Sequence, residues 1–255
     1  MPKLFVLRYF IELSYFGEAY SGWQIQPNAI SIQETLEKAL TLILREPIKI
    51  TGQGRTDAGV HAIQSFAHFD IAHLAMFPDE LCFKLNSLLP SDIAIKRIFE
   101  VPETAHARFS PICRSYQYII SSQKNPFYHN RSWPVYRKLT ISSMKEAAIQ
   151  LMGPHDFTSF SSAKSDTDSR VCTINRLDFE AKNDLLIIHI TADRFVMNMV
   201  RTIVGTLVEV GLGKRNPDEM ASLLALKNRQ TTGENAPACG LYLREVKYPE
   251  HIFTI

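Results

Sequence analysis

The order of strands and helices along the chain is the feature that most restricts its fold. Strand-like and helix-like segments follow one another as strand, helix, strand, strand, helix, strand, and this order occurs twice in the 255 residues. In the first half we expect strands at 4–14, 47–52, 62–70 and 92–101, with one helix beginning after Ser31 and another over 78–89. This is the split β-α-β-β-α-β arrangement of ferredoxin-like sheets, so the order predicts an α+β fold.

Local signals support both helices of the first half. Ser31 and Glu34 have the spacing of a capping box, and apolar residues then recur at helical intervals as far as Ile43. Pro78 is followed by two acidic residues, which favour the first turn of a helix.

The second half repeats the order with longer segments. The expected strands are 112–121, 171–181, 185–192 and 240–248, and the expected helices are 142–152, 196–210 and one beginning at Asn216 and Pro217. The two middle strands are predicted to form a hairpin across residues 182–184. The halves share the order of elements but no residue-level repeat. We therefore expect two αβ domains, residues 1–105 and 106–255, with a linker near 102–111.

Composition excludes several classes of protein. With 45% hydrophobic residues, 11 glycines and a net charge of +2, the chain is neither disordered nor collagen-like. No apolar run approaches the roughly 18 residues of a membrane-spanning helix, and the N-terminus does not have the pattern of a signal peptide. Cys82, Cys113, Cys172 and Cys239 are spaced too widely to suggest a zinc site. We interpret them as reduced thiols and expect a cytoplasmic protein.

The near-balanced net charge hides an uneven distribution. Residues 1–105 contain 9 basic and 12 acidic side chains, whereas residues 106–255 contain 19 and 14. No acidic residue occurs from Thr104 to Lys145, and we call this segment the acid-free stretch. Its basic residues are Arg108, Arg114, Lys124, Arg131, Arg137, Lys138 and Lys145, and its aromatic residues are Phe109, Tyr116, Tyr118, Phe127, Tyr128, Trp133 and Tyr136.

Cations that contact phosphates and rings that stack on bases are what a looped or single-stranded nucleic acid requires of a binding surface. The acid-free stretch therefore indicates an RNA-type ligand. The alternative is a half-buried strand followed by an ordinary solvated loop.

The segment Gly52-Gln-Gly-Arg-Thr-Asp-Ala-Gly-Val-His61 carries the clearest chemical signal. It lacks the G-K-[ST] ending of a phosphate loop, so its glycines do not predict a nucleotide site. Gly59 allows a tight turn just after Asp57, and Arg55 shares a face with Asp57 only if the local chain is extended. The alternative is a connecting turn with an exposed aspartate. His61 and His68 have no third ligand at a suitable spacing, so we predict no metal site.

Arg201 is unusual because it lies inside a long apolar helix. On a helical wheel it falls at the margin of the apolar arc, away from the polar arc that includes Asn198 and Thr202. A guanidinium there must extend to solvent or find a carboxylate, since an unpaired buried charge is costly. Both interpretations stay open. An ion pair with Asp57 across a cleft would keep that carboxylate ionised at neutral pH.

Six segments, taken in order, resemble one known family over nearly the whole chain. They are Ser21-Gly-Trp-Gln24, Gly54-Arg-Thr-Asp-Ala-Gly-Val-His-Ala62, His106-Ala-Arg-Phe-Ser110 with Tyr116-Gln-Tyr118, Asp156-Phe-Thr-Ser-Phe160, Met199-Val-Arg201 with Ile203-Val-Gly205, and Ala236-Pro-Ala-Cys-Gly-Leu-Tyr-Leu243. These segments resemble the tRNA pseudouridine synthase A family. One departure is Tyr15-Phe-Gly17-Glu18, where the family usually has an Asp before the glycine.

The resemblance implies an enzyme that isomerises uridine to pseudouridine at positions 38–40, in the anticodon stem-loop of tRNA. It also implies a homodimer that needs no cofactor. The fold it implies has two ferredoxin-like halves with their sheets joined and the active-site cleft between them. Residues 1–105 would then carry the catalytic aspartate, and residues 106–255 the RNA-binding stretch and the dimer interface.

The resemblance also assigns roles to individual residues. Asp57 matches the essential aspartate, which acts as a nucleophile or as a base. Tyr116 would stack on the uracil and Arg201 would orient Asp57. Arg55 would enter the RNA helix or replace the extruded nucleotide, because the target base must leave its stack. The further residues expected to contact the substrate are Thr56, His61, Arg108 and Arg114.

Two other functions stay open at this point. One is an RNA-binding protein that uses the same scaffold without catalysis. The other is a base-excising glycosidase, which would use the carboxylate with an activated water and release free uracil.

Overall fold

The computed structural model describes residues 6–162 and 169–253, so the first two residues of the predicted strand 4–14 lie outside its range. By their contacts the residues form two compact units. Unit 1 is Met1–Ile112 together with Leu243–Ile255, and unit 2 is Cys113–Tyr242. The division into domains at residues 105 and 106 stays a prediction.

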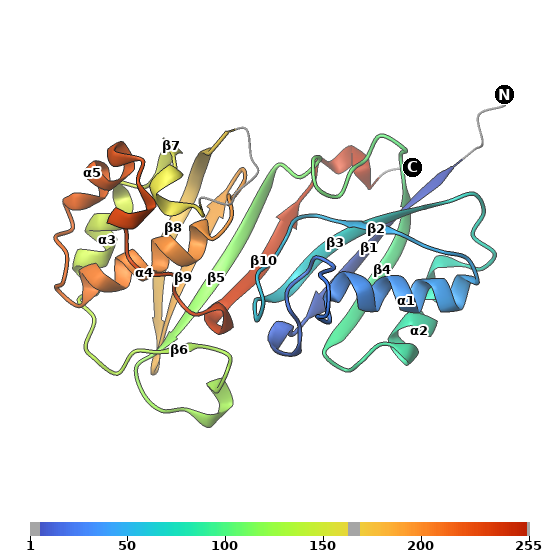
Figure 1. The fold of residues 1–255 in the computed structure, drawn as a ribbon, viewed down its shortest axis with the longest axis horizontal. Coiled ribbons are helices and arrows are strands. Elements are labelled where there is room, and N and C mark those ends of the chain that lie inside the picture. The colour runs from blue at the N-terminus through green and yellow to red at the C-terminus, as the bar shows by residue number, and fades with distance from the viewer. Residues whose placement is uncertain (1–5, 163–168, 254–255) are drawn as a thin grey trace. The chain divides into compact units, whose positions relative to one another are not determined.

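Unit 1 is an antiparallel sheet with two helices. Its strands are β1 (Leu7–Tyr15), β2 (Ile50–Gly52), β3 (His61–Ile71) and β4 (Ile93–Val101), and its helices are α1 (Ile32–Leu44) and α2 (Pro78–Leu88). β1 lies between β4 and β3, and the short β2 pairs with β3. The last strand, β10 (Leu241–Lys247), also neighbours β3 and has most of its residues in this unit. Both helices lie on one face of the sheet (Figure 1).

The sequence pattern explains why these elements form and pack. The Ser31 hydroxyl accepts a hydrogen bond from the Glu34 backbone N–H at 3.2 Å, as the capping box predicts. Leu36 and Leu40 of α1 are fully buried, as are Phe10 on β1 and Phe66 on β3. Burial of side chains of this size stabilises a fold by about 1.5–3 kcal/mol each. The result is a rigid base for the loop between β2 and β3.

Unit 2 has the same general construction. Its strands are β5 (Cys113–Ser121), β6 (Trp133–Pro134), β7 (Gly153–Asp156), β8 (Val171–Lys182) and β9 (Leu185–Ala192), and its helices are α3 (Ile141–Ile149), α4 (Met199–Gly211) and α5 (Glu219–Leu226). The strand order is β5-β9-β8-β7, all antiparallel, and β6 pairs with the end of β5. The three helices gather on one face of this sheet (Figure 1).

The predicted hairpin is confirmed. Lys182 pairs with Leu185, and Asn183 in the turn has a φ of 54°, a conformation that asparagine tolerates well. The short strands β6 and β7 were not predicted, since two and four residues give no periodic signal.

Two helix starts were predicted too early. The helix expected from residue 196 begins at Met199, because Asn198 adopts a left-handed φ of 66° and interrupts the chain before it. The helix expected from Pro217 begins at Glu219. Asn216 nonetheless acts as a capping side chain, since its Oδ1 accepts the Asp218 N–H at 3.1 Å.

Candidate active site

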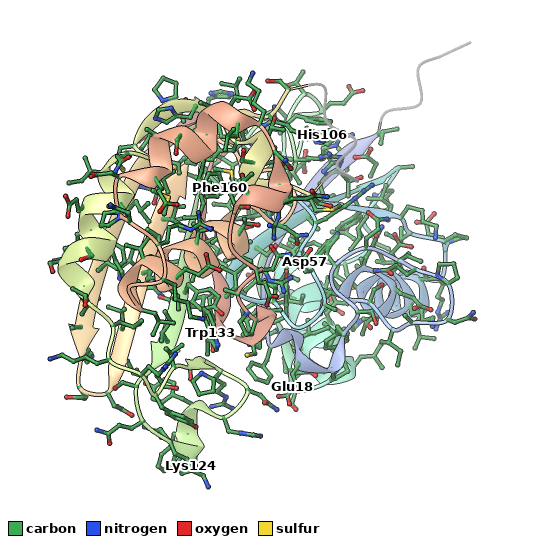
Figure 2. All side chains as sticks on the ribbon, turned by 60° about the vertical axis from the view of Figure 1, so that its left-hand side comes forward. Glu18, Asp57, His106, Lys124, Trp133 and Phe160 are labelled. Carbon is green, nitrogen blue, oxygen red and sulfur yellow. The ribbon has the colours of Figure 1, made fainter. Side chains whose placement is uncertain are left out.

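Asp57 lies in the loop between β2 and β3, where Figure 2 labels it. The Val60 N–H donates to the Asp57 carbonyl at 3.2 Å, and Gly59 has a φ of 78°, so the chain turns sharply just after the aspartate. Arg55 is exposed, Thr56 is buried and Asp57 is partly exposed. This alternation is the one expected if the local chain is extended, the condition under which Arg55 and Asp57 share a face.

A second segment, residues 15–23, holds this loop through Thr56. The Tyr15 hydroxyl lies 2.9 Å from Thr56 Oγ1, with both groups buried. The Trp23 N–H donates to the Thr56 carbonyl at 3.1 Å, and the Gly59 N–H reaches the Tyr20 carbonyl at 3.4 Å. We call residues 15–23 the clamp segment, because its contacts fix the backbone on both sides of Asp57.

The buried His61 joins the clamp segment to the start of β3. Its Nδ1 accepts the Gly17 N–H at 3.0 Å, so the ring proton of the neutral side chain is on Nε2. The Phe16 ring stacks on the imidazole, with centroids 4.2 Å apart and planes within 3°. His61 is 1% exposed and Thr56 is 8% exposed, so both lie beneath the loop surface. Their contact with a substrate stays a prediction.

Two glycines allow this close packing. A Cβ at Gly17 would lie 2.0 Å from the Val60 carbonyl oxygen, and a Cβ at Gly22 would lie 2.4 Å from the Thr56 carbonyl oxygen. Gly22 also has a φ of 90°. The sequence pattern did not identify either glycine as part of the site. The available signal was their place in Tyr15-Phe-Gly17 and Ser21-Gly-Trp, next to aromatic residues that turn out to be buried or partly buried.

Tyr20 ties the clamp segment to the start of β4. Its hydroxyl donates to Asp92 Oδ1 at 2.6 Å. Burial, together with that hydrogen bond, raises the pKa of Tyr20, so the phenol stays protonated and remains a donor.

In unit 2, Tyr116 and Arg114 point to the same face of β5, two residues apart. The Tyr116 ring meets Phe195 edge to face, with centroids 5.1 Å apart. The Arg114 Nη1 donates to the Asp193 carbonyl at 3.2 Å. Both side chains are partly exposed. The next residue on this face, Tyr118, is fully buried.

Arg201 lies on the first turn of α4 and is partly exposed. Its Nε donates to the Ala236 carbonyl at 2.7 Å, and the Ala236 N–H donates back to the Arg201 carbonyl at 3.0 Å. The loop before Ala236 approaches α4 closely, since a Cβ at Gly205 would lie 1.9 Å from the Glu234 carbonyl oxygen. From the sequence we expected this guanidinium to extend to solvent or to pair with a carboxylate. We did not predict its hydrogen bond to a backbone carbonyl.

The predicted site residues thus fall into two groups. In unit 1, Arg55, Thr56 and Asp57 share one loop, His61 begins the strand that follows it, and Arg108 follows β4. The residues in unit 2 are Arg114, Tyr116 and Arg201. Since Asp57 and Arg201 lie in different units, their ion pair stays a prediction.

The acid-free stretch presents most of its cations to solvent. Six of its seven basic side chains are exposed, and Arg114 is partly exposed. Lys124, labelled in Figure 2, belongs to the long loop after β5. Phe109, Phe127 and Tyr136 are exposed by 74%, 81% and 66%, whereas Tyr118 is in the core. The stretch therefore combines structural rings with exposed rings and cations.

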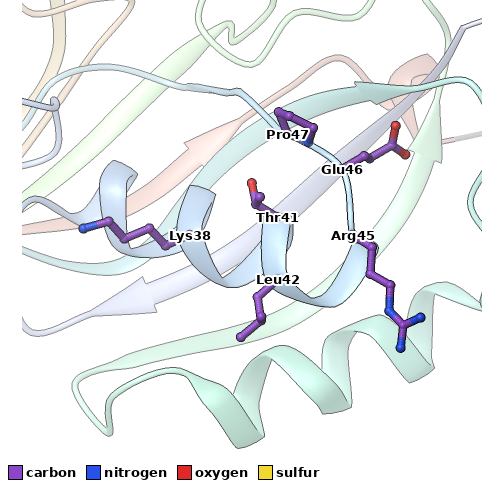
Figure 3. A pocket seen from close by; sticks show the side chains of 6 residues that line it. All are labelled: Lys38, Thr41, Leu42, Arg45, Glu46 and Pro47. Carbon is purple, nitrogen blue, oxygen red and sulfur yellow. The ribbon is translucent and has the colours of Figure 1, made fainter.

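A separate hollow of about 530 Å³ lies at the end of α1 (Figure 3). It is lined by Lys38, Thr41, Leu42, Arg45, Glu46 and Pro47. The opposite end of α1 contacts the clamp segment, where the Ile32 N–H donates to the Gly22 carbonyl at 3.2 Å. The 13 residues of α1 span about 20 Å, so the hollow is not part of the Asp57 loop.

Within residues 6–162 and 169–253, no three His, Cys, Asp or Glu side chains are grouped as metal ligands would be. Over the same residues, no helix is long and apolar enough to cross a membrane.

The sequence is similar to known proteins over most of its length. A family model described as tRNA pseudouridine synthase matches residues 13–110 and 147–249. A tRNA pseudouridine synthase A of Bacteroides fragilis is 44% identical over 249 residues, which is 97% of this chain and 99% of the relative. The proteins of the same name from Porphyromonas gingivalis and Bacillus subtilis are 45% and 40% identical, over 96% and 92% of this chain and 99% and 97% of their own lengths.

Proposed function

The chain belongs to the tRNA pseudouridine synthase family, and we propose that it isomerises uridine to pseudouridine in tRNA with Asp57 as the reacting carboxylate. The assignment of Asp57 as the reacting residue rests on the structure of its loop. Asp57 is partly exposed, while Thr56 before it is held by Tyr15 and Trp23, and Gly59 after it is held by Tyr20. A reacting group needs this combination of access and fixed position.

The reaction rearranges bonds without net gain or loss of atoms. The N1–C1′ bond breaks, the uracil turns, and a C5–C1′ bond forms. The proton on C5 leaves and N1 receives one, so no oxidant and no net water is consumed. A carboxylate can serve as nucleophile at C1′ or at C6, or as a base at the ribose. Each of these routes assigns the reacting group to the Asp57 side chain.

Residues of unit 2 would complete the site. Tyr116 has a partly exposed ring supported by Phe195, which suits stacking on the uracil. Arg201 would orient Asp57, with its Nε already fixed on the Ala236 carbonyl. Arg55 is exposed beside Asp57 and would occupy the space left by the extruded nucleotide. Base extrusion costs a few kcal/mol, which contacts of this kind would offset.

We assign the phosphate contacts to the acid-free stretch. Reversing Arg131, Arg137 and Lys138 to Glu is expected to weaken tRNA binding and to flatten its dependence on salt. The slope of log K against log salt concentration should fall by about 0.7–0.9 for each phosphate that the protein no longer neutralises. Filter binding at several salt concentrations measures both quantities.

The matched control reverses the exposed Lys38, Lys84 and Lys96 of unit 1, which changes the net charge by the same amount. Equal effects of the two triple variants would mean that only net charge matters. That result would remove the acid-free stretch from its assigned role.

Incubation of the protein with unmodified tRNA, followed by mapping of pseudouridine by position, tests the function itself. We expect product in the anticodon stem-loop at positions 38–40. Binding without product would support the non-catalytic alternative, and release of free uracil would indicate a glycosidase. Product at other positions alone would contradict the stem-loop assignment.

The homodimer implied by the resemblance and the cytoplasmic location expected from the reduced cysteines also belong to this proposal. Sedimentation equilibrium of the purified chain checks the first, since a mass near 29.0 kDa at assay concentration would contradict it. Fractionation of the producing cells checks the second.

A further inference from the structure

The loop that follows β4 has an ordered turn that carries an exposed phenylalanine. His106, labelled in Figure 2, accepts two backbone N–H groups through its Nδ1, from Arg108 at 3.1 Å and from Phe109 at 3.3 Å. The Ser110 N–H donates to the His106 carbonyl at 3.0 Å, and the Ser110 hydroxyl accepts the His106 N–H at 2.9 Å. The turn is therefore closed by its own hydrogen bonds. We call residues 106–110 the His106 turn.

A second histidine anchors this turn to the sheet of unit 1. The Nδ1 of His68, on β3, accepts the Ala107 N–H at 3.2 Å. The Tyr248 hydroxyl donates to the Ala107 carbonyl at 2.7 Å, and Ala107 is fully buried. The rings of His68 and His106 meet edge to face, with centroids 4.8 Å apart. Both backbone groups of Ala107 are therefore bonded to side chains of the unit.

Arg8 holds the preceding residues. Its guanidinium donates to the carbonyls of Glu103 and Ala105 at 2.9 and 2.8 Å, and it forms a two-pronged ion pair with Asp70 at 2.7 Å. The whole turn is thus fixed, although its tip projects into solvent.

The tip presents a ring and a cation together. Phe109 is 74% exposed, and its ring packs on the inner side against the imidazole of His106, with centroids 4.4 Å apart. The guanidinium carbon of Arg108 lies 5.4 Å from the ring centroid. A large apolar ring that is exposed to solvent does not contribute to the core. The charged side chains of the acid-free stretch are all Lys or Arg, so its charged groups are basic.

We propose that Phe109 stacks on an unpaired base of the tRNA, with Arg108 at a neighbouring phosphate, and that His68 and His106 are the positioning residues of this contact. This inference rests on the proposed function, because it takes tRNA as the ligand. Bases stack on exposed aromatic rings in single-stranded and looped RNA, and this stacking does not require a particular base.

Both positioning histidines must be neutral for Nδ1 to accept an N–H. Burial lowers the pKa of His68 to about 4, with Arg8 and His106 adding to the effect. Burial and the cations Arg8 and Arg108 also lower the pKa of His106. At pH 7 the electrostatic surroundings therefore favour the form that the hydrogen bonds require.

The first test uses Phe109→Trp and follows tryptophan emission while unmodified tRNA is added. Stacking on a base should quench the added emission. The control is Phe83→Trp on α2, because Phe83 is 73% exposed in the same unit but follows the acidic Asp79 and Glu80. Equal responses of the two variants, after subtraction of the wild-type signal, would overturn the proposal.

The second test measures pseudouridine formation by Phe109→Leu, Phe109→Tyr and Phe83→Leu. We expect KM for tRNA to rise about tenfold in Phe109→Leu with little change in kcat, and to be restored in Phe109→Tyr. Phe83→Leu should match the wild type. If the wild type forms pseudouridine and Phe109→Leu does so with an unchanged KM, the stacking contact is refuted while the proposed function stands. If the wild type forms none, the proposed function itself fails.

His106→Asn and His106→Leu test the positioning role. The Asn side chain keeps an acceptor near the place of Nδ1, whereas Leu removes it. KM should therefore rise in His106→Leu, as in Phe109→Leu, and rise less in His106→Asn, which keeps the acceptor but loses the ring that packs against Phe109. An unchanged KM in His106→Leu would exclude His106 as a positioning residue.

Discussion

His68 should make the stability of the protein depend on pH between about 4 and 6.5. The ordinary pKa of the side chain is 6.5, and burial, Arg8 and His106 lower it to about 4, with Asp70 acting in the opposite direction. Between these values the unfolded chain holds a proton that the folded chain does not. The free energy of unfolding therefore falls as the pH falls through this range, and the contribution of His68 is fully present above pH 6.5.

The size of the effect follows from the same values. At pH 5 the medium is 1.5 pH units below the ordinary pKa of 6.5 but still above the folded value of about 4. At about 1.4 kcal/mol for each pH unit, lowering the pH from 7.5 to 5 should cost about 2 kcal/mol of stability through this one side chain.

Urea unfolding at pH 7.5 and pH 5 measures this cost. Trp23 is 3% exposed in unit 1, so in a Trp133→Phe background its emission reports the unfolding of that unit. The comparison is His68→Asn, which keeps an acceptor for the Ala107 N–H but does not titrate. The wild type should lose about 2 kcal/mol more than the variant between the two pH values. Equal losses would refute the assigned burial and pairing of His68.

The remaining predictions concern the clamp segment and α4. Gly17→Ala should destabilise the protein by about 3 kcal/mol and lower kcat, because the added Cβ would lie 2.0 Å from the Val60 carbonyl oxygen and displace the Asp57 loop. Thermal unfolding measures the first effect and the pseudouridine assay the second. Tyr15→Phe removes the hydroxyl 2.9 Å from Thr56 Oγ1 and should cost about 1 kcal/mol in urea unfolding; an unchanged midpoint would contradict this contact. Gly205→Ala should raise the rate of proteolysis near residues 233–237, since the added Cβ would displace that loop from α4. A wild-type cleavage pattern would contradict the close approach of the loop to Gly205.

Much of the fold could be predicted because its signals are local. The helix cap at Ser31, the apolar spacing of α1 and the turn at Asn183 each act over a few residues, and each is present in the structure. The helix starts at Met199 and Glu219 were misplaced, because a single left-handed residue or an Asx turn decides them and leaves the apolar pattern unchanged.

The surroundings of Asp57 could not be predicted in the same way. The motif around Asp57 could be identified in the sequence. Tyr15 and Gly17, at and just after the end of β1, contact this loop only in the folded chain. The pair His68 and His106 is a similar case. The two residues are 38 positions apart, so neither one alone indicates that they bracket one turn.

The central claim is that the Asp57 carboxylate carries out the reaction, and Asp57→Asn tests it most directly. The amide has nearly the shape of the carboxylate but is neither a nucleophile nor a base of comparable strength. Single-turnover formation of pseudouridine, with enzyme in excess over unmodified tRNA, should fall by more than about a thousandfold. Binding of tRNA, measured in the same buffer, should change by only several-fold. Appreciable turnover by Asp57→Asn, with binding intact, would contradict the central role of this aspartate.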